Sequence, residues 1–135
     1  MTGEVRKTSY TGGQKGQKPN RQDLIAVPWL EQLGLVCGMG AEKYDDDNWR
    51  KGYSWRLSYG ALLRHLHAFW AGEVYDKESG LPHLAHVAWH SMVLHTFSQD
   101  PQYAEFDDRP DKHPPVTTAP ARVIPQDFVY DWVVE

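Results

Sequence analysis

Ionisable side chains gather in one stretch of the sequence, residues 64–89. Seven imidazoles and carboxylates lie within it: His65, His67, Glu73, Asp76, Glu78, His83 and His86. The same stretch carries two apolar helical patterns that meet at Ser79 and Gly80. Apolar residues that only fill a core have no need of charged neighbours on the same turns, so this clustering predicts a functional site.

Glu73 and Asp76 are three residues apart, so on a continuous helix they share one face and can bind a hard cation between them. His65 precedes Asp76 by eleven residues, which is close to three full turns, and so faces the same way. A water molecule at such a cation could lose its proton to a carboxylate or to His65. These three residues are therefore the predicted catalytic residues.

Three amphipathic patterns predict helices over residues 28–44, 55–77 and 82–97. Each begins at a residue that suits a first turn or an N-cap: Pro28, Ser54 and Pro82. Gly80 favours an end of the second helix near residue 77, whereas Gly72 leaves open an earlier end at Ala71. In that alternative, residues 73–76 lie in a turn.

Antiparallel packing of the first two helices would place Glu31 beside Glu73. The start of the third helix would bring His83 and His86 to the same end. Carboxylates that converge from different helices suit Mg2+ or Mn2+ and, through the metal, a phosphate chain. Taken alone, Glu31 is equally consistent with a solvated surface residue.

The two ends of the chain differ from this helical domain, which we assign to residues 23–98. Residues 1–22 have the composition of a flexible leader, although Lys15 and Lys18 among glycines would also suit a segment that covers a polyanion. Residues 99–135 are rich in proline and are expected to form an irregular arm. The apolar last ten residues are expected to dock on the bundle or on a neighbouring subunit.

Composition limits the classes of partner. A net charge of -4 gives no overall basic field for duplex DNA. Cys37 is the only cysteine, so one chain has no disulfide framework, which fits a reducing cytoplasm. No signal-peptide core and no run of 18 apolar residues occurs, so we expect a soluble protein with no membrane partner.

Several motifs occur together in a fixed order over residues 12–97. They are Gly40-Ala41-Glu42-Lys43-Tyr44, Asn48-Trp49-Arg50-Lys51-Gly52, Arg64-His65-Leu66, Gly72-Glu73 with Asp76, Glu78-Ser79-Gly80 and His83-Leu84-Ala85-His86. In this order they resemble the phage dATP/dGTP diphosphohydrolase family, the MazZ-like branch of the MazG-type all-alpha NTP pyrophosphohydrolases.

The resemblance implies an all-α, MazG-like helical bundle completed by oligomerisation. It also implies an enzyme that uses acidic residues and Mg2+ or Mn2+ to split a purine deoxynucleoside triphosphate into the monophosphate and pyrophosphate. In a phage such an enzyme would act in the host cytoplasm and serve a modified-purine genome. The choice between dGTP and dATP is left open.

The superfamily pattern is Glu-x-x-Glu on one helix and Glu-x-x-Asp on the next. Glu73 and Asp76 match the second half, whereas the first half departs from the pattern at both Glu31 and Glu42. Glu31 is favoured as the further metal ligand because Glu42 lies roughly 16 Å further along the helix, at 1.5 Å per residue. Glu42 stays the alternative.

Residues with cationic, amide, aromatic or imidazole side chains are the candidates to hold the nucleotide. They are Lys15, Lys18, Lys43, Asn48, Trp49, Arg50, Arg64, His83 and His86. Helices that are apolar on several sides predict a homo-oligomer, a dimer or dimer of dimers, in which a second chain supplies residues such as Lys43, Asn48 and Trp49.

A rival interpretation belongs to another functional class. His83, His86 and His90 are spaced by three and four residues, which places three imidazoles on one helical face. This spacing also suits a non-catalytic helical phage protein that binds a transition metal.

Overall fold

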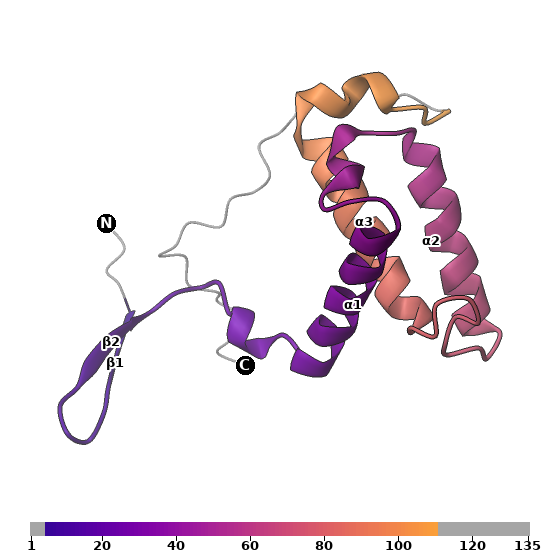
Figure 1. Ribbon diagram of the computed structural model, residues 1–135. Coiled ribbons are helices and arrows are strands. Elements are labelled where there is room, and N and C mark those ends of the chain that lie inside the picture. Colours follow the sequence, from indigo (N-terminus) through magenta and orange to yellow (C-terminus); the bar gives the residue numbers. More distant parts are fainter. Residues whose placement is uncertain (1–4, 111–135) are drawn as a thin grey trace. The chain divides into compact units, whose positions relative to one another are not determined.

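The computed structural model describes residues 5–110 of the 135-residue chain (Figure 1). These residues form two units, residues 5–25 and residues 26–110, which are described separately. The prediction that the last ten residues dock lies outside the described residues. Among the described residues, no helix combines the length and apolar character needed to cross a membrane.

The first unit is a β-hairpin followed by a short 3-10 helix. Strands β1 (Val5–Thr8) and β2 (Gln14–Gln17) pair antiparallel, and η1 (Gln22–Leu24) follows. Gly12 adopts a φ of 91° in the turn, a conformation that favours glycine. The composition of residues 1–22 predicted a flexible leader, whereas backbone hydrogen bonds form a hairpin that needs little apolar burial.

The second unit is helical, which confirms the all-α prediction. It contains α1 (Val27–Lys43), η2 (Asn48–Lys51), α2 (Trp55–Trp70), α3 (His83–Gln99) and η3 (Pro101–Phe106). Helix α3 packs against α1, α2 and η3, whereas α1 and α2 make few direct contacts. Figure 1 shows α2 descending and α3 returning beside it, so the loop between them lies at one end of the unit.

An aromatic core joins α2, α3 and η3. Its buried residues are Trp55, Val93, Phe97 and Tyr103. The Tyr103 hydroxyl donates to the carbonyl of Arg50 at 2.6 Å. The prediction of an irregular chain from residue 99 is wrong for η3. The Asp100 side chain caps this helix by accepting a hydrogen bond from the Gln102 amide. Pro101 is tolerated in the first turn because its missing N–H would have no partner there.

Helix α2 ends at Trp70, so the preferred prediction of a helix to residue 77 is wrong and the alternative end at Ala71 is confirmed. Gly72 has a φ of 105°. Its N–H donates to Phe69, and the N–H of Glu73 donates to Ala68, which is a Schellman end. Glu73 and Asp76 therefore lie in a loop and do not share a helix face.

Backbone hydrogen bonds shape the loop over residues 71–82. The His83 N–H donates to the carbonyl of Val74 at 3.0 Å, and the Asp76 N–H donates to that of Leu81 at 2.8 Å. The loop thus folds back on itself between the two helices. This places Glu73 and Asp76 beside the first turn of α3.

Candidate active site

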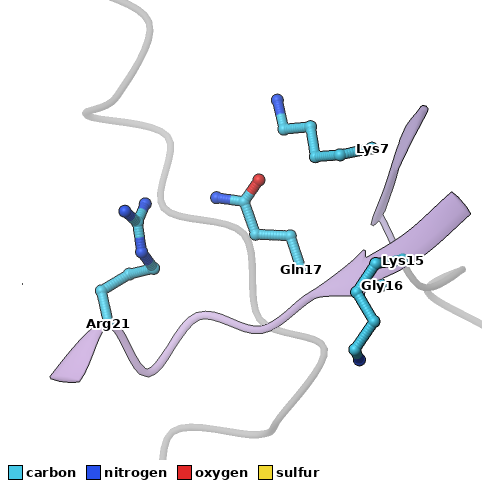
Figure 2. A pocket seen from close by; sticks show the side chains of 5 residues that line it. All are labelled: Lys7, Lys15, Gly16, Gln17 and Arg21. Atoms are coloured by element: carbon cyan, nitrogen blue, oxygen red, sulfur yellow. The ribbon is translucent and has the colours of Figure 1, made fainter. Parts of the chain in front are cut away.

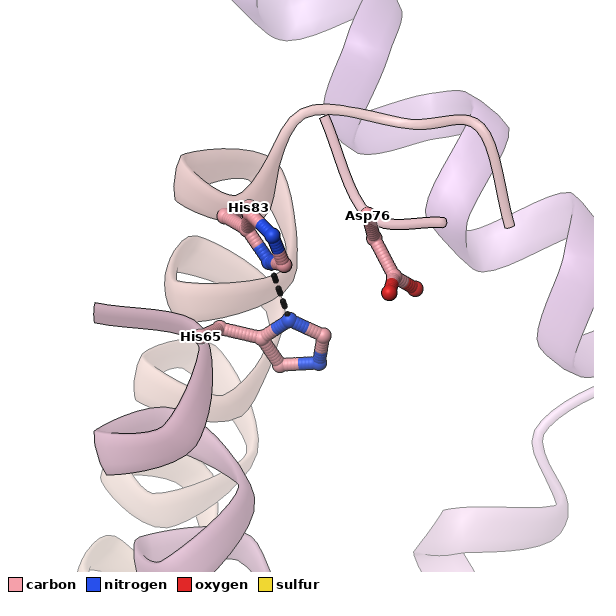
Figure 3. Close-up of side chains that lie close together, drawn as sticks. All are labelled: His65, Asp76 and His83. Carbon is pink, nitrogen blue, oxygen red and sulfur yellow. Dashed lines mark hydrogen bonds between the residues drawn. The ribbon is translucent and has the colours of Figure 1, made fainter. Parts of the chain in front are cut away.

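Three side chains converge from α2, the 71–82 loop and α3. His65 Nδ1 lies 2.9 Å from His83 Nδ1, and Asp76 points toward the same space (Figure 3). One ligand atom from each of these residues lies within 4.8 Å of the others. His83 is buried, whereas His65 and Asp76 are partly exposed, so the cluster remains open to solvent on one side. We call His65, Asp76 and His83 the metal-competent cluster.

Glu73 determines the proton position on His83. Its Oε1 lies 3.1 Å from His83 Nε2. Because a carboxylate accepts, Nε2 of His83 is the donor to Glu73; with a single ring proton on His83, that proton lies on Nε2 and Nδ1 carries a lone pair. That lone pair faces His65.

Ser79 holds the carboxylate of Asp76. The Ser79 hydroxyl donates to Asp76 Oδ2 at 2.9 Å, and His86 Nε2 lies 2.8 Å from the same hydroxyl. Because the Ser79 hydroxyl donates its proton to Asp76, its oxygen must accept a hydrogen bond from Nε2–H of His86. Burial raises the pKa of Asp76, but hydrogen bonds from Ser79 and from the Glu78 amide outweigh this effect and lower the pKa overall. Asp76 is therefore ionised at neutral pH.

Three imidazole rings, those of His65, His86 and His90, form a row that begins at the metal-competent cluster. His65 stacks on His86 with ring centroids 4.3 Å apart, and the His90 ring is 6.2 Å from that of His65. Burial lowers the pKa of all three, and that of His90 falls to about 4. The rings are therefore neutral at pH 7 and can act as ligands or accept protons.

A cavity of about 800 Å³ adjoins the row of rings at His90. Its walls come from the end of α1, the residues around η2, the start of α2 and the middle of α3, and they include Asn48, Trp49, Arg50, Tyr53, Ser58 and Trp89. Ser58 is fully buried and contacts both the Tyr53 hydroxyl at 2.5 Å and His90 Nδ1 at 3.0 Å. The volume and the mixed aromatic and polar walls suit a nucleoside.

The structure brings together five of the residues proposed from the sequence: His65, Glu73, Asp76, His83 and His86. Three others, Asn48, Trp49 and Arg50, line the cavity. Glu31, Glu42 and Lys43 are exposed on α1, and Arg64 is exposed on α2. Among the described residues, neither Glu31 nor Glu42 joins the metal-competent cluster.

The leader lysines belong to the hairpin unit. Lys15 lines a shallow hollow of about 490 Å³ together with Lys7, Gln17 and Arg21 (Figure 2). The Arg21 guanidinium donates two hydrogen bonds to the Asp23 carboxylate, at 2.7 and 2.9 Å. Lys18 is exposed.

The three histidines of the rival interpretation, His83, His86 and His90, do not converge on one metal site. His83 contacts His65 and Glu73, whereas His90 contacts Ser58. Within residues 5–110, the group that can hold a metal is the metal-competent cluster.

Sequence reasoning missed Ser79, Ser58 and Tyr53 as site residues. Ser79 follows Asp76 by three residues before a glycine, a spacing typical of a turn closed by an Asp side chain, and this pattern was available in the sequence. Ser58 carries no such local pattern, because its partner His90 is 32 residues away, and Tyr53 is connected to His90 only through Ser58.

Comparison with known proteins gives one family. The family model described as "dATP/dGTP diphosphohydrolase, N-terminal" matches residues 9–109. No curated protein and no solved structure matches the chain significantly. The family match spans the hairpin turn, all three α-helices and the whole metal-competent cluster, and it covers more than half of the sequence. The chain therefore belongs to the dATP/dGTP diphosphohydrolase N-terminal domain family.

Proposed function

We propose that this protein hydrolyses a purine deoxynucleoside triphosphate, dGTP or dATP or both, to the monophosphate and pyrophosphate. The family name is that of a diphosphohydrolase, a hydrolase that acts on nucleoside triphosphates. The observation that carries the proposal is the nucleoside-sized cavity lined by His90, whose ring lies 6.2 Å from that of His65 in the metal-competent cluster.

The cavity suits the base and sugar of the substrate. Trp49 and Trp89 offer aromatic faces for stacking, and the Asn48 amide can both donate to and accept from a base edge. The Arg50 guanidinium lies 4.6 Å from the Trp49 ring centroid. Its charge is partly offset by Asp47 at 3.0 Å, and a phosphate could compete for it.

We propose that the metal-competent cluster holds the divalent cation of the reaction, Mg2+ or Mn2+. His65, Asp76 and His83 would hold the ion, with Glu73 and Ser79 fixing the orientation of His83 and Asp76. When bound, the ion would neutralise phosphate oxygens and lower the pKa of a water molecule. Glu31 or Glu42 would join this set only if another subunit brought them there.

We assign to Glu73 the role of accepting the proton of the attacking water. Its Oε1 is occupied by His83, which leaves Oε2 as the acceptor, and the side chain is partly exposed. The water oxygen would bond to the α-phosphorus as the bond to the bridging α–β oxygen breaks. Pyrophosphate then leaves as one unit.

Exposed apolar residues on α1 and α2 support a homo-oligomer. Val27, Leu35, Leu57 and Trp70 are exposed by 61, 53, 64 and 87% of their surfaces. A second copy of the chain would cover these residues and could bring Lys43 toward the nucleotide. The proposed setting is phage nucleotide metabolism for a modified-purine genome, in the host cytoplasm.

The deciding experiment incubates the purified full chain with each of the four dNTPs and either Mg2+ or Mn2+. We expect dGTP, dATP or both to give the monophosphate and pyrophosphate, with little turnover of dCTP and dTTP. Asp76→Asn serves as the inactive control because it keeps the side-chain shape and deletes the charge. Release of inorganic phosphate with dNDP, or no turnover of any dNTP, would overturn the proposal.

A further inference from the structure

Two of the three ligand residues in the metal-competent cluster are imidazoles. We infer that this cluster selects a transition-metal ion, of the class of Mn2+, Co2+ or Zn2+, in preference to Mg2+. The inference deepens the proposed function, on which it rests, because it names the class of ion used at the same site.

The spacing of the nitrogens matches a pair of metal ligands. Two nitrogens that each lie about 2.1 Å from a metal ion, with an N–metal–N angle of about 90°, are about 3.0 Å apart. The Nδ1 atoms of His65 and His83 are 2.9 Å apart. Without a cation, one of these nitrogens must donate a proton to the other, whereas a metal ion can accept both lone pairs.

Each ligand is oriented by a partner outside the cluster. Glu73 fixes the ring of His83 through Nε2, Ser79 holds the carboxylate of Asp76, and the His86 ring lies against His65 at an interplanar angle of 6°. Metal-binding histidines are typically held in this way, with the second ring nitrogen bonded to a carboxylate or carbonyl. The contact between Glu73 and His83 leaves the Nδ1 lone pair directed at the cluster.

Ligand chemistry then decides between the ions. Mg2+ prefers oxygen ligands in near-ideal octahedral geometry and keeps much of its water, whereas imidazole suits first-row transition metals. Two histidines and one carboxylate form the donor set of many transition-metal sites, with the remaining positions open. Here those positions would take water and phosphate oxygens.

The test measures metal binding in the absence of nucleotide. The full chain is stripped with EDTA and titrated with Co2+, whose visible absorption reports nitrogen ligation, and Mn2+, Zn2+ and Mg2+ then compete. We expect one Co2+ per chain, displacement by Zn2+, and little displacement by a large molar excess of Mg2+. Displacement by Mg2+ at concentrations equal to those of Co2+ would overturn the inference.

Variants link the binding to the named ligands. His65→Gln and His83→Gln should each weaken Co2+ binding by more than about 100-fold, and Glu73→Gln by about 10- to 100-fold. His67→Gln is the matched control, because this exposed histidine is on α2 but outside the cluster. Unchanged Co2+ affinity in His65→Gln would overturn the assignment.

A measurement on the unmodified chain guards against variants that fail to fold. Zn2+ should shift the ring 15N NMR resonances of His65 and His83 and leave those of the exposed His67 and His95 in place. The reverse pattern would overturn the inference. Hydrolysis is measured separately: Mg2+-selective binding with dNTP turnover intact defeats only this inference, whereas Co2+ binding without any turnover defeats only the proposed function.

Discussion

Glu73 accepts a hydrogen bond from Nε2 of His83 at 3.1 Å, although the two residues are ten positions apart in the sequence. Glu73 directly follows the Schellman end of α2, and His83 is the first residue of α3. The carboxylate thus joins the end of one helix to the start of the next. It also sets the tautomer of a buried imidazole in the metal-competent cluster.

Glu73→Gln should leave the fold intact and lower kcat by at least about 100-fold, a typical contribution of a general base. The amide keeps the side-chain shape but can neither accept the water's proton at Oε2 nor hold His83 Nε2–H as strongly. Initial rates of pyrophosphate release at saturating metal measure the effect, with circular dichroism to check the fold.

Glu78→Gln is the matched control for this substitution, because Glu78 is an exposed carboxylate in the same loop. Its turnover should stay close to that of the unmodified chain. Near-normal turnover in Glu73→Gln would remove Glu73 from the catalytic assignment.

Gly52→Ala should destabilise the helical unit by about 2 kcal/mol or more, since both backbone strain and overpacking act there. Gly52 has a φ of 91°, and a Cβ at this position would overlap the ring of Phe106. Urea unfolding of both proteins measures the change.

Gly34→Ala is the comparison for this effect, because it lies within α1 and its added Cβ would meet no atom within 4 Å. Alanine there should raise stability by about 0.5 to 1 kcal/mol, as is common for exposed helix interiors. Equal effects of the two substitutions would contradict the packing of Phe106 on Gly52.

Helix positions could be predicted from the sequence because apolar periodicity acts locally, as do Pro28 in the first turn of α1 and Pro82 at the N-cap of α3. The end of α2 was ambiguous, because residues 73–77 are compatible with a helix and the left-handed conformation of Gly72 decides against it. The hairpin was missed because it is built from backbone hydrogen bonds and buries little apolar surface.

The candidate site was predictable in its residues but not in its geometry. His65, Glu73, Asp76 and His83 stood out by residue type, yet the argument from a shared helix face was wrong for Glu73 and Asp76, which a loop brings into place. Residues such as Ser58 could not be identified, because their role depends on tertiary contacts between helices.

Stability of the metal-free chain should fall as the pH is lowered from about 6.5 to about 4. Burial is the main reason that the pKa of His90 is lowered to about 4, with His65, His86 and Arg64 contributing repulsion. The unfolded chain, with an ordinary histidine pKa near 6.5, binds this proton first, so the stabilisation is complete above about 6.5 and is lost through this window.

The size of this pH effect should be about 2 kcal/mol, after allowance for the partial exposure of the ring. Urea unfolding at several pH values measures it. His90→Gln should flatten the pH dependence, whereas His95→Gln, which changes an exposed histidine on the same helix, should not. An unchanged pH profile in His90→Gln would show that other groups titrate.

The full chain should form a homo-oligomer, a dimer or dimer of dimers, because α1 and α2 leave large apolar side chains in water. Trp70 is exposed over 87% of its surface and Leu57 over 64%, and burying two such side chains is worth roughly 3 to 6 kcal/mol.

Trp70→Glu should therefore weaken association, because it places a charge in an apolar interface. Lys77→Glu, a change at an exposed loop residue, should leave the mass unaltered. Light scattering at micromolar concentration measures the mass, and a value near 15.5 kDa with full activity would exclude the oligomer.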